Sequence, residues 1–178
     1  MTIGKILKWL GIVLLGAAAL FVIVGLFLPR DWHVERSVTI TGSREQIHAL
    51  VADPEQWERW MFDMDALPAE TELSAEGQGV GGSVSWSGPA GRGQMTLTEA
   101  DPQTGIRWDG KIETDEVNNH GKIEYRDLGD GQVEVTLTDE GTLPPVIGGY
   151  FVFVMNSALD THFEAALGRL EHAVEAGG

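Results

Sequence analysis

The side chains that could carry out chemistry in this chain are scattered along it. The 178 residues include no cysteine, which excludes a disulfide framework, a cysteine zinc site, an iron–sulfur cluster and a thiol nucleophile. No two histidines have the i, i+4 spacing of a helical zinc pair, and no serine lies in a nucleophile-elbow sequence. The histidines are His33, His48, His120, His162 and His172. The sequence therefore predicts no metal site, no cofactor and no identifiable catalytic residue.

A glycine-rich stretch has the spacing of a dinucleotide-binding loop. Gly77, Gly79 and Gly82 stand in the G-x-G-x-x-G pattern, which binds a pyrophosphate only where a strand precedes it and a helix follows it. Here residues 83–87 alternate serine with apolar residues, which is the pattern of a strand. We therefore interpret the glycine-rich stretch as a hairpin turn.

Arg36 has the position of an inward-pointing cation. It shares its parity with Val34, Val38 and Ile40 in a strand expected over residues 33–40. An arginine that points inward needs a carboxylate partner or the anionic head of a ligand. The alternative is a residue near the end of the strand whose guanidinium reaches water.

The charge of the chain is strongly acidic and unevenly distributed. There are 12 basic and 27 acidic side chains, a formal net charge of −15. A nucleic-acid-binding surface needs clustered lysine and arginine, so we expect no nucleic-acid partner. Lys5 and Lys8 are the only charged side chains before residue 29. Residues 29–178 carry ten basic and 27 acidic side chains, a formal charge of −17.

Residues 9–28 contain no charged and no strongly polar side chain. Twenty helical residues span about 30 Å, the thickness of the hydrocarbon core of a bilayer. We therefore predict a short tail over 1–8, a transmembrane helix over 9–28 and a linker over 29–32. The alternative is a secretory signal peptide cleaved near Ala19. We favour an uncleaved anchor because the apolar run continues far beyond that residue.

The residues that flank this helix favour one orientation. Lys5, Lys8 and the terminal amine favour a cytoplasmic N-terminus, although two arginines beyond the helix reduce the bias. We expect a single-pass protein of the inner or plasma membrane, with its domain outside the cytoplasm. Trp9 and Trp32 bracket the helix, as interfacial aromatic residues do.

Beyond the linker, the pattern predicts one α+β domain. A strand over 33–40 leads to a helix capped by Ser43 and a second short helix from Pro54. Residues 69–143 then alternate apolar and polar side chains in about six strands, and helical periodicity returns over 146–175. The expected turns lie at 88–91, 101–105, 118–121 and 130–131. We expect the last helix to cover the apolar face of the sheet, because no other large apolar element remains.

The order of these elements and several motifs resemble the START-like (SRPBCC) superfamily, which includes polyketide cyclase/dehydrase and lipid-transport families. The resemblance covers about residues 33–175. The matching features are 34–40, the helix after Ser43, Trp57 and Trp60, 79–81 before Trp86, Gly91 and Gly93, and 167–170. The resemblance implies an α+β helix-grip fold, in which a curved antiparallel sheet of about seven strands wraps around a long C-terminal helix. It also implies two short helices after the first strand and an apolar cavity between sheet and helix.

A set of large side chains falls on the covered side of the sheet and the last helix, and the resemblance makes them candidates for ligand binding. They are Trp86, Met95, Trp108, Tyr125, Phe151, Met155, Leu159 and Phe163. We expect them to bind an apolar small molecule or lipid, with Tyr125 and Asp63 or Asp65 adding polar contacts. Two alternatives stay open: a cyclase- or dehydratase-like enzyme, and an envelope protein-interaction module with a filled core. Gly148 and Gly149 are either a hinge at the cavity mouth or a fraying first turn.

Overall fold

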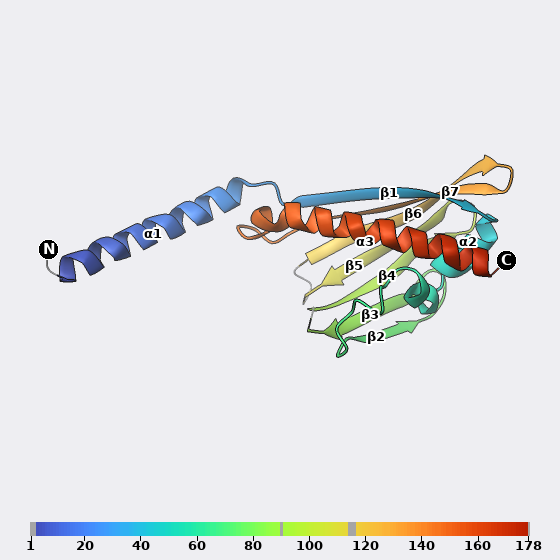
Figure 1. Ribbon diagram of the computed structural model, residues 1–178, viewed down its shortest axis with the longest axis horizontal. Coiled ribbons are helices and arrows are strands. Elements are labelled where there is room, and N and C mark those ends of the chain that lie inside the picture. The colour runs from blue at the N-terminus through green and yellow to red at the C-terminus, as the bar shows by residue number, and fades with distance from the viewer. Residues whose placement is uncertain (1–2, 90, 114–116, 178) are drawn as a thin grey trace.

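The computed structural model describes residues 3–89, 91–113 and 117–177 (Figure 1). One long helix precedes a domain in which a strand, two short helices, six more strands and a second long helix follow one another. The elements are α1 (Ile3–Phe27), β1 (Asp31–Thr41), α2 (Arg44–Val51), the 3-10 helix η1 (Pro54–Arg59), β2 (Glu72–Glu76), β3 (Ser83–Gly88), β4 (Gly91–Asp101), β5 (Gly105–Ile112), β6 (Val117–Gly129), β7 (Gln132–Thr142) and α3 (Gly148–Ala176).

The seven strands form one antiparallel sheet in the order β1-β7-β6-β5-β4-β3-β2. β1 joins the far edge beside β7, and the other strands follow as a meander. Figure 1 shows α3 lying across one face of the sheet, close to β1, with α2 and η1 near its C-terminal end. The predicted helix-grip α+β fold is therefore confirmed.

Two short helices, α2 and η1, lie at one end of the space between the sheet and α3. The residues that cap them can be recognised in the sequence. Ser43 Oγ accepts from the backbone N–H of Gln46 at 3.2 Å, and Gln46 Oε1 accepts from the N–H of Ser43 at 2.8 Å, which completes the capping box. At η1, Asp53 Oδ1 accepts from the N–H of Glu55 at 3.1 Å, and Pro54 occupies the first position of the helix.

The glycine-rich stretch connects β2 to β3, as the hairpin interpretation requires. Gly77, Gly79 and Gly81 have φ angles of 74°, 63° and 90°, which are left-handed and favour glycine. The N–H of Gly82 donates to the carbonyl of Gly79 at 3.0 Å. A strand, not a helix, follows this turn, so the stretch lacks the helix N-terminus that binds a pyrophosphate.

Two boundaries differ from the sequence prediction. β1 begins at Asp31, so the last two residues of the expected linker belong to the sheet. The turn predicted over 118–121 is wrong, because these residues lie inside β6, where Asn119 pairs with Gly110 and Gly121 pairs with Trp108. Asn119 and Gly121 are accommodated on the inner face near the start of this strand because Asn119 borders a cavity and Gly121 lies under Trp108.

The end of the grip near α2 and η1 is a solid core. Trp57 and Trp60 are 1% and 0% exposed, and their rings meet edge to face with centroids 5.8 Å apart. Their indole N–H groups donate to the carbonyls of Val51 at 2.9 Å and Leu50 at 3.2 Å, so both side chains are buried without an unpaired donor. From α3, Phe163, Ala166, Leu167, Leu170 and Val174 complete this core.

On the inner face of the sheet, large side chains lie over glycines of the neighbouring strand. Trp108 pairs with Gly121, and a Cβ placed on Gly121 would lie 2.0 Å from the indole ring. Two further tryptophans repeat this arrangement, with corresponding distances of 2.3 Å: Trp86 over Gly93 and Trp32 over Gly141. Each ring can lie flat on the sheet only because its partner has no side chain.

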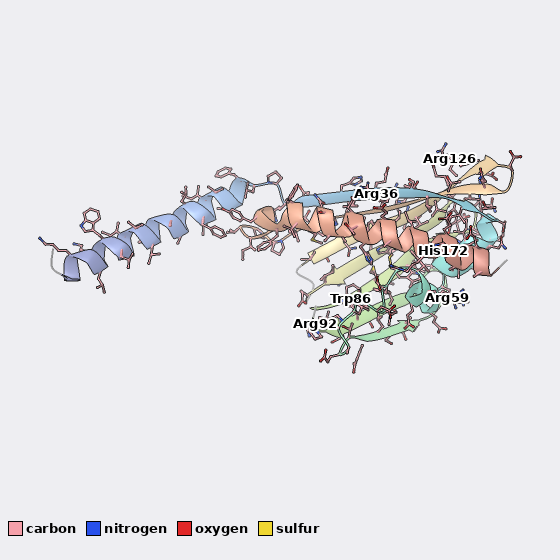
Figure 2. All side chains as sticks on the ribbon, in the orientation of Figure 1. Arg36, Arg59, Trp86, Arg92, Arg126 and His172 are labelled. Atoms are coloured by element: carbon pink, nitrogen blue, oxygen red, sulfur yellow. The ribbon has the colours of Figure 1, made fainter. Side chains whose placement is uncertain are left out.

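α1 stands apart from the domain and contacts it at one end only. Figure 2 shows the side chains of this helix pointing freely in all directions over most of its length. At its C-terminal end the rings of Phe21 and Tyr150 stack 4.4 Å apart, and Tyr150 Oη donates to the carbonyl of Phe21 at 2.7 Å. A Cβ on Gly25 would lie 2.4 Å from the carbonyl oxygen of Val146, and one on Gly149 would lie 2.4 Å from Leu28 Cβ. Gly25 and Gly149 thus permit the end of α1 and the residue that follows it to approach the start of α3 closely.

We expect Gly121→Ala to destabilise the domain by about 1–3 kcal/mol, because the new methyl group forces Trp108 off the sheet. Gly168→Ala is the matched control. A Cβ at Gly168 would meet nothing within 4 Å, so the substitution should stabilise α3 by about 0.5–1 kcal/mol. Denaturant unfolding measures both effects, and an unchanged midpoint for Gly121→Ala would contradict the packing described here.

Candidate ligand cavity

A cavity of about 180 Å³ lies between α3 and the inner face of the sheet. Its walls come from α3 and from every strand except β2, with Met61 and Phe62 entering from the segment after η1. The lining residues are Trp32, Met61, Phe62, Trp86, Met95, Trp108, Ile112, Asn119, Asp139, Met155, Leu159, His162 and Phe163. Trp32 is at the start of β1, Ile112 at the end of β5 and Asp139 near the end of β7. These strand ends lie on the side of α1, so the cavity is in the half of the grip next to that helix (Figure 1).

Six of the eight residues predicted to bind a ligand line this cavity: Trp86, Met95, Trp108, Met155, Leu159 and Phe163. Figure 2 labels Trp86, which enters from β3 and is half-buried. Tyr125 lies elsewhere, in the solid core, where its hydroxyl is 3.3 Å from His48 Nδ1. Phe151 is 57% exposed on the first half of α3 and does not line the cavity.

The polar residues expected beside the cavity lie elsewhere as well. Asp63 and Asp65 are exposed, and Asp63 Oδ2 is 3.6 Å from Arg169 Nη1. Arg169 also donates from Nε to the carbonyl of Trp60 at 3.0 Å, and so ties the end of η1 to α3. The sequence prediction missed the polar groups that do line the cavity, Asp139 and Asn119. A signal for Asp139 was available, because it has the same parity as the apolar residues of β7.

Trp32 is also not where the sequence analysis placed it. It is 2% exposed and lines the cavity, so it is a core residue of the domain rather than an interfacial aromatic residue. Its indole Nε1 donates to Asp139 Oδ1 at 2.8 Å. The need of a buried carboxylate for a donor explains why a tryptophan so close to the apolar helix folds inward.

Asp139 is a carboxyl group in an apolar environment, 4% exposed. Its second oxygen, Oδ2, accepts from Asn119 Nδ2 at 2.6 Å. Burial raises the pKa of Asp139 to about 6, because the charged form loses its hydration. The hydrogen bonds from Trp32 and Asn119 act in the opposite direction and lower this pKa, but burial dominates.

His162 borders the cavity from α3. Burial lowers the pKa of His162, and the positive charge of Arg169 lowers it further, while the carboxylate of Asp63 opposes both effects. The imidazole is therefore neutral at pH 7. The cavity thus presents aromatic, sulfur-containing and aliphatic surface with a small polar end, and among its described lining residues Asp139 is the only acidic one.

Arg36 has the carboxylate partner that an inward-pointing arginine requires. Its guanidinium pairs with Asp160 of α3, and a further N–H donates to the carbonyl of Glu35 at 3.0 Å. Both side chains of the ion pair stay partly exposed at the β1 edge (Figure 2). The pair joins α3 to β1, and among the described residues that line the cavity there is no arginine to bind an anionic head group.

Comparison with known proteins agrees with this architecture. Residues 31–175 match the family described as "Polyketide cyclase / dehydrase and lipid transport". The chain therefore belongs to this family, and the START-like (SRPBCC) resemblance is confirmed. A search of curated proteins finds no sequence match.

Solved structures share the fold at low sequence identity. Norcoclaurine synthase from Thalictrum flavum, in complex with dopamine and hydroxybenzaldehyde, is 15% identical with a TM-score of 0.62, covering 88% of this chain and 93% of that chain. A protein from Thermus thermophilus is 17% identical with a TM-score of 0.59, covering 83% and 99%. The di-domain ARO/CYC BexL from the BE-7585A biosynthetic pathway is 17% identical with a TM-score of 0.58, covering 81% and 46%. At these identities the likeness establishes the fold alone.

We expect the buried Asp139 to make stability depend on pH. Its pKa is higher in the folded state than the unfolded value near 3.8, so the contribution to stability is complete below pH 4. It is lost as the pH rises through about 6, by about 3 kcal/mol in total. Asp139→Asn removes this loss and retains an acceptor for Trp32 Nε1.

The measurement is the free energy of unfolding of wild type and Asp139→Asn between pH 4 and pH 8. The difference between them should change by about 3 kcal/mol in favour of the variant as the pH rises. Asp130→Asn is the control, because it removes the same charge from an exposed turn. A difference that does not vary with pH would show that the pKa of Asp139 is not raised.

Proposed function

We propose that this chain is a membrane-tethered binding protein that holds a small apolar molecule in the cavity beneath α3. The observation that carries this proposal is the position of the cavity. It is hollow, mostly apolar, and lies in the half of the grip next to the apolar helix α1, whereas the opposite half is solid. An apolar pocket with a few polar groups is the usual form of a small-molecule site.

The size of the cavity limits the ligand. An apolar cavity of about 150 Å³ is enough to bind benzene. The present cavity, at about 180 Å³, therefore fits a group of about one ring or the end of a longer chain. Of a lipid or isoprenoid, only one end would be enclosed, and the remainder would extend through the mouth of the cavity.

Membrane tethering is supported by α1. Leu7–Phe27 is long and apolar enough to cross a bilayer, and almost none of it is buried against the rest of the chain. A signal sequence has the same apolar character. The packing of Gly25 and Phe21 against the start of α3 favours retention, because cleavage would uncover this contact. With Lys5 and Lys8 before the helix, we infer a cytoplasmic N-terminus and a domain outside the cytoplasm.

The apolar half of α3, residues 148–159, extends this membrane contact. Residues 143–159 contain no charged side chain, although the remaining domain is strongly acidic. Phe151, Phe153 and Val154 are 57%, 81% and 62% exposed, next to the end of α1. Large exposed apolar side chains at a membrane helix favour insertion into the interfacial region. Residues 143–159 themselves carry no charge, so repulsion by anionic lipids does not act directly on this half of α3.

A cyclase- or dehydratase-like enzyme is the second candidate, favoured by the presence of Asp139 and His162 in the cavity wall. A carboxyl group and an imidazole can both transfer protons as general acids or bases. Both carboxyl oxygens of Asp139 are already held by Trp32 and Asn119, which argues for a structural carboxyl group rather than a mobile proton donor. The third interpretation, an interaction module with a filled core, is disfavoured by the hollow.

We expect Met155→Trp to abolish binding, because the larger ring would fill the cavity. Val154→Trp is the control, since Val154 is 62% exposed and does not line the cavity. Native mass spectrometry of the detergent-extracted full chain, with p-xylene as the probe, measures the bound fraction. Wild type and Val154→Trp should bind the probe and Met155→Trp should lose at least about tenfold in affinity. Wild type that binds neither the probe nor any co-purified molecule would contradict the proposed function.

We expect the apolar half of α3 to touch lipid. The chain has no cysteine, so Phe153→Cys and His172→Cys each carry one environment-sensitive thiol label. In nanodiscs, brominated lipids should quench the label at 153 and leave the label at 172 unquenched, because His172 lies at the far end of α3 (Figure 2). Equal quenching by an aqueous quencher at both positions would refute the lipid contact.

The label at 172 also tests the orientation. In intact cells, a membrane-impermeant thiol reagent should modify His172→Cys if the domain lies outside the cytoplasm. Modification that requires cell lysis would reverse the inferred orientation.

A further inference from the structure

Two buried polar atoms, on residues that line the cavity, have no hydrogen-bond partner among the described residues. They are the indole Nε1 of Trp108 and the amide Oδ1 of Asn119. Trp108 is 1% exposed and Asn119 is 6% exposed, so water outside the domain does not reach them. A buried donor and a buried acceptor that remain unpaired cost free energy, and a native structure retains them where a partner is supplied from elsewhere.

The sheet places the side chains that carry these two atoms on its inner face, on neighbouring strands. Trp108 lies over Gly121, and its Nε1 would be 2.5 Å from a Cβ at that position. Asn119 lies over Gly110, and its Oδ1 would be 1.9 Å from a Cβ there. Trp108 and Gly110 are two residues apart on β5, and Asn119 and Gly121 are two residues apart on β6, so all four share the inner face.

The hydrogen bonds of the neighbouring strand fix which atom of Asn119 is left free. Its Nδ2 donates to Asp139 Oδ2 at 2.6 Å, which turns Oδ1 away from β7 and toward β5. The other oxygen of Asp139 is occupied by Trp32 Nε1 at 2.8 Å. At the polar end of the cavity, one N–H donor and one carbonyl acceptor are therefore unpaired, and each oxygen of the carboxylate beside them already accepts a hydrogen bond.

We propose that Trp108 Nε1 and Asn119 Oδ1 form a subsite for a neutral hydroxyl group at the end of an apolar ligand. A hydroxyl oxygen accepts the indole N–H and donates its own hydrogen to the amide oxygen, which satisfies both atoms at once. A carboxylate cannot donate to Asn119, and it would lie beside Asp139. An ether or ketone can accept from Trp108 but leaves Asn119 unpaired. The subsite therefore selects an alcohol or phenol.

This inference rests on the proposed binding function, and its test separates the two. The probes are 4-ethylphenol and 4-ethyltoluene, which differ only in a hydroxyl or a methyl group of similar size on one ring. Affinities are measured with the full chain in nanodiscs. Two hydrogen bonds to buried groups should make 4-ethylphenol bind about tenfold more tightly than 4-ethyltoluene.

Variants of the two residues isolate the subsite. Trp108→Phe keeps an aromatic ring and removes the donor, and Asn119→Leu keeps the volume and removes the acceptor. Each should reduce the ratio of the two affinities by about threefold or more. Val154→Leu, at an exposed position of α3 outside the cavity, is the control and should keep the wild-type ratio. The ratio cancels the different partitioning of the probes into lipid.

The outcomes are distinct. Equal affinities in wild type would overturn the hydroxyl subsite while leaving the binding function intact, as expected if a water molecule satisfies both atoms permanently. A hydroxyl preference that persists in both Trp108→Phe and Asn119→Leu would also overturn it. Failure of both probes to bind wild type would overturn the proposed function itself. Should Trp108→Phe fail to fold, the wild-type ratio and Asn119→Leu still decide the question.

Discussion

The interior of this domain depends on the absence of side chains at a few positions of the sheet. Trp32, Trp86 and Trp108 lie flat because glycines stand opposite them on the neighbouring strands. Had those positions carried side chains, the rings would stand upright and meet α3, and the half of the grip near α1 would be as solid as the half near η1. The cavity is therefore not a packing defect. It is the space left when broad side chains cover a floor of glycine and α3 is held above it by the Phe163–Leu170 core and the Arg36–Asp160 pair.

The same arrangement explains how a carboxyl group can be buried there. Asp139 stands next to Gly121 and Val34 in the register of the sheet, so small neighbours leave room for Trp32 and Asn119 to reach it. Each of these partners donates one hydrogen bond to the carboxyl group of Asp139. Because Asn119 Nδ2 donates to Asp139, the orientation of the Asn119 amide is fixed. The polarity of the cavity is therefore set by a hydrogen-bond chain that begins in β1 and crosses β7 to β6.

The sequence was sufficient to predict the fold, because alternation, capping and helical periodicity act locally. Such local rules predict the capping box at Ser43 and the strands from Ser83 to Thr142. They also predict the apolar face of α3 that ends at Val174. The site was harder to predict, because it depends on cross-strand register. Parity assigned Trp86 and Trp108 to the covered face correctly, yet only the register reveals that glycines lie under them. Asn119 looked like part of a turn, since its neighbours are polar and glycine residues. Phe151 was placed inside by its periodicity, but it is 57% exposed, and nothing in the described part of the domain covers most of its ring.

The connection between α1 and β1 has a mechanical consequence. Only Leu28, Pro29 and Arg30 separate the two elements, a reach of about 10 Å at full extension. Even that short reach is restrained, because proline fixes one torsion and Arg30 exchanges hydrogen bonds with Leu143, at 2.9 Å through its carbonyl and 3.0 Å through its guanidinium. The short, restrained connection therefore keeps the domain close to the end of α1 and limits its movement relative to that helix. With α1 in a bilayer, the distance between the domain and the lipid surface is fixed. Any molecule or protein that the domain binds must then come within one domain length of that surface.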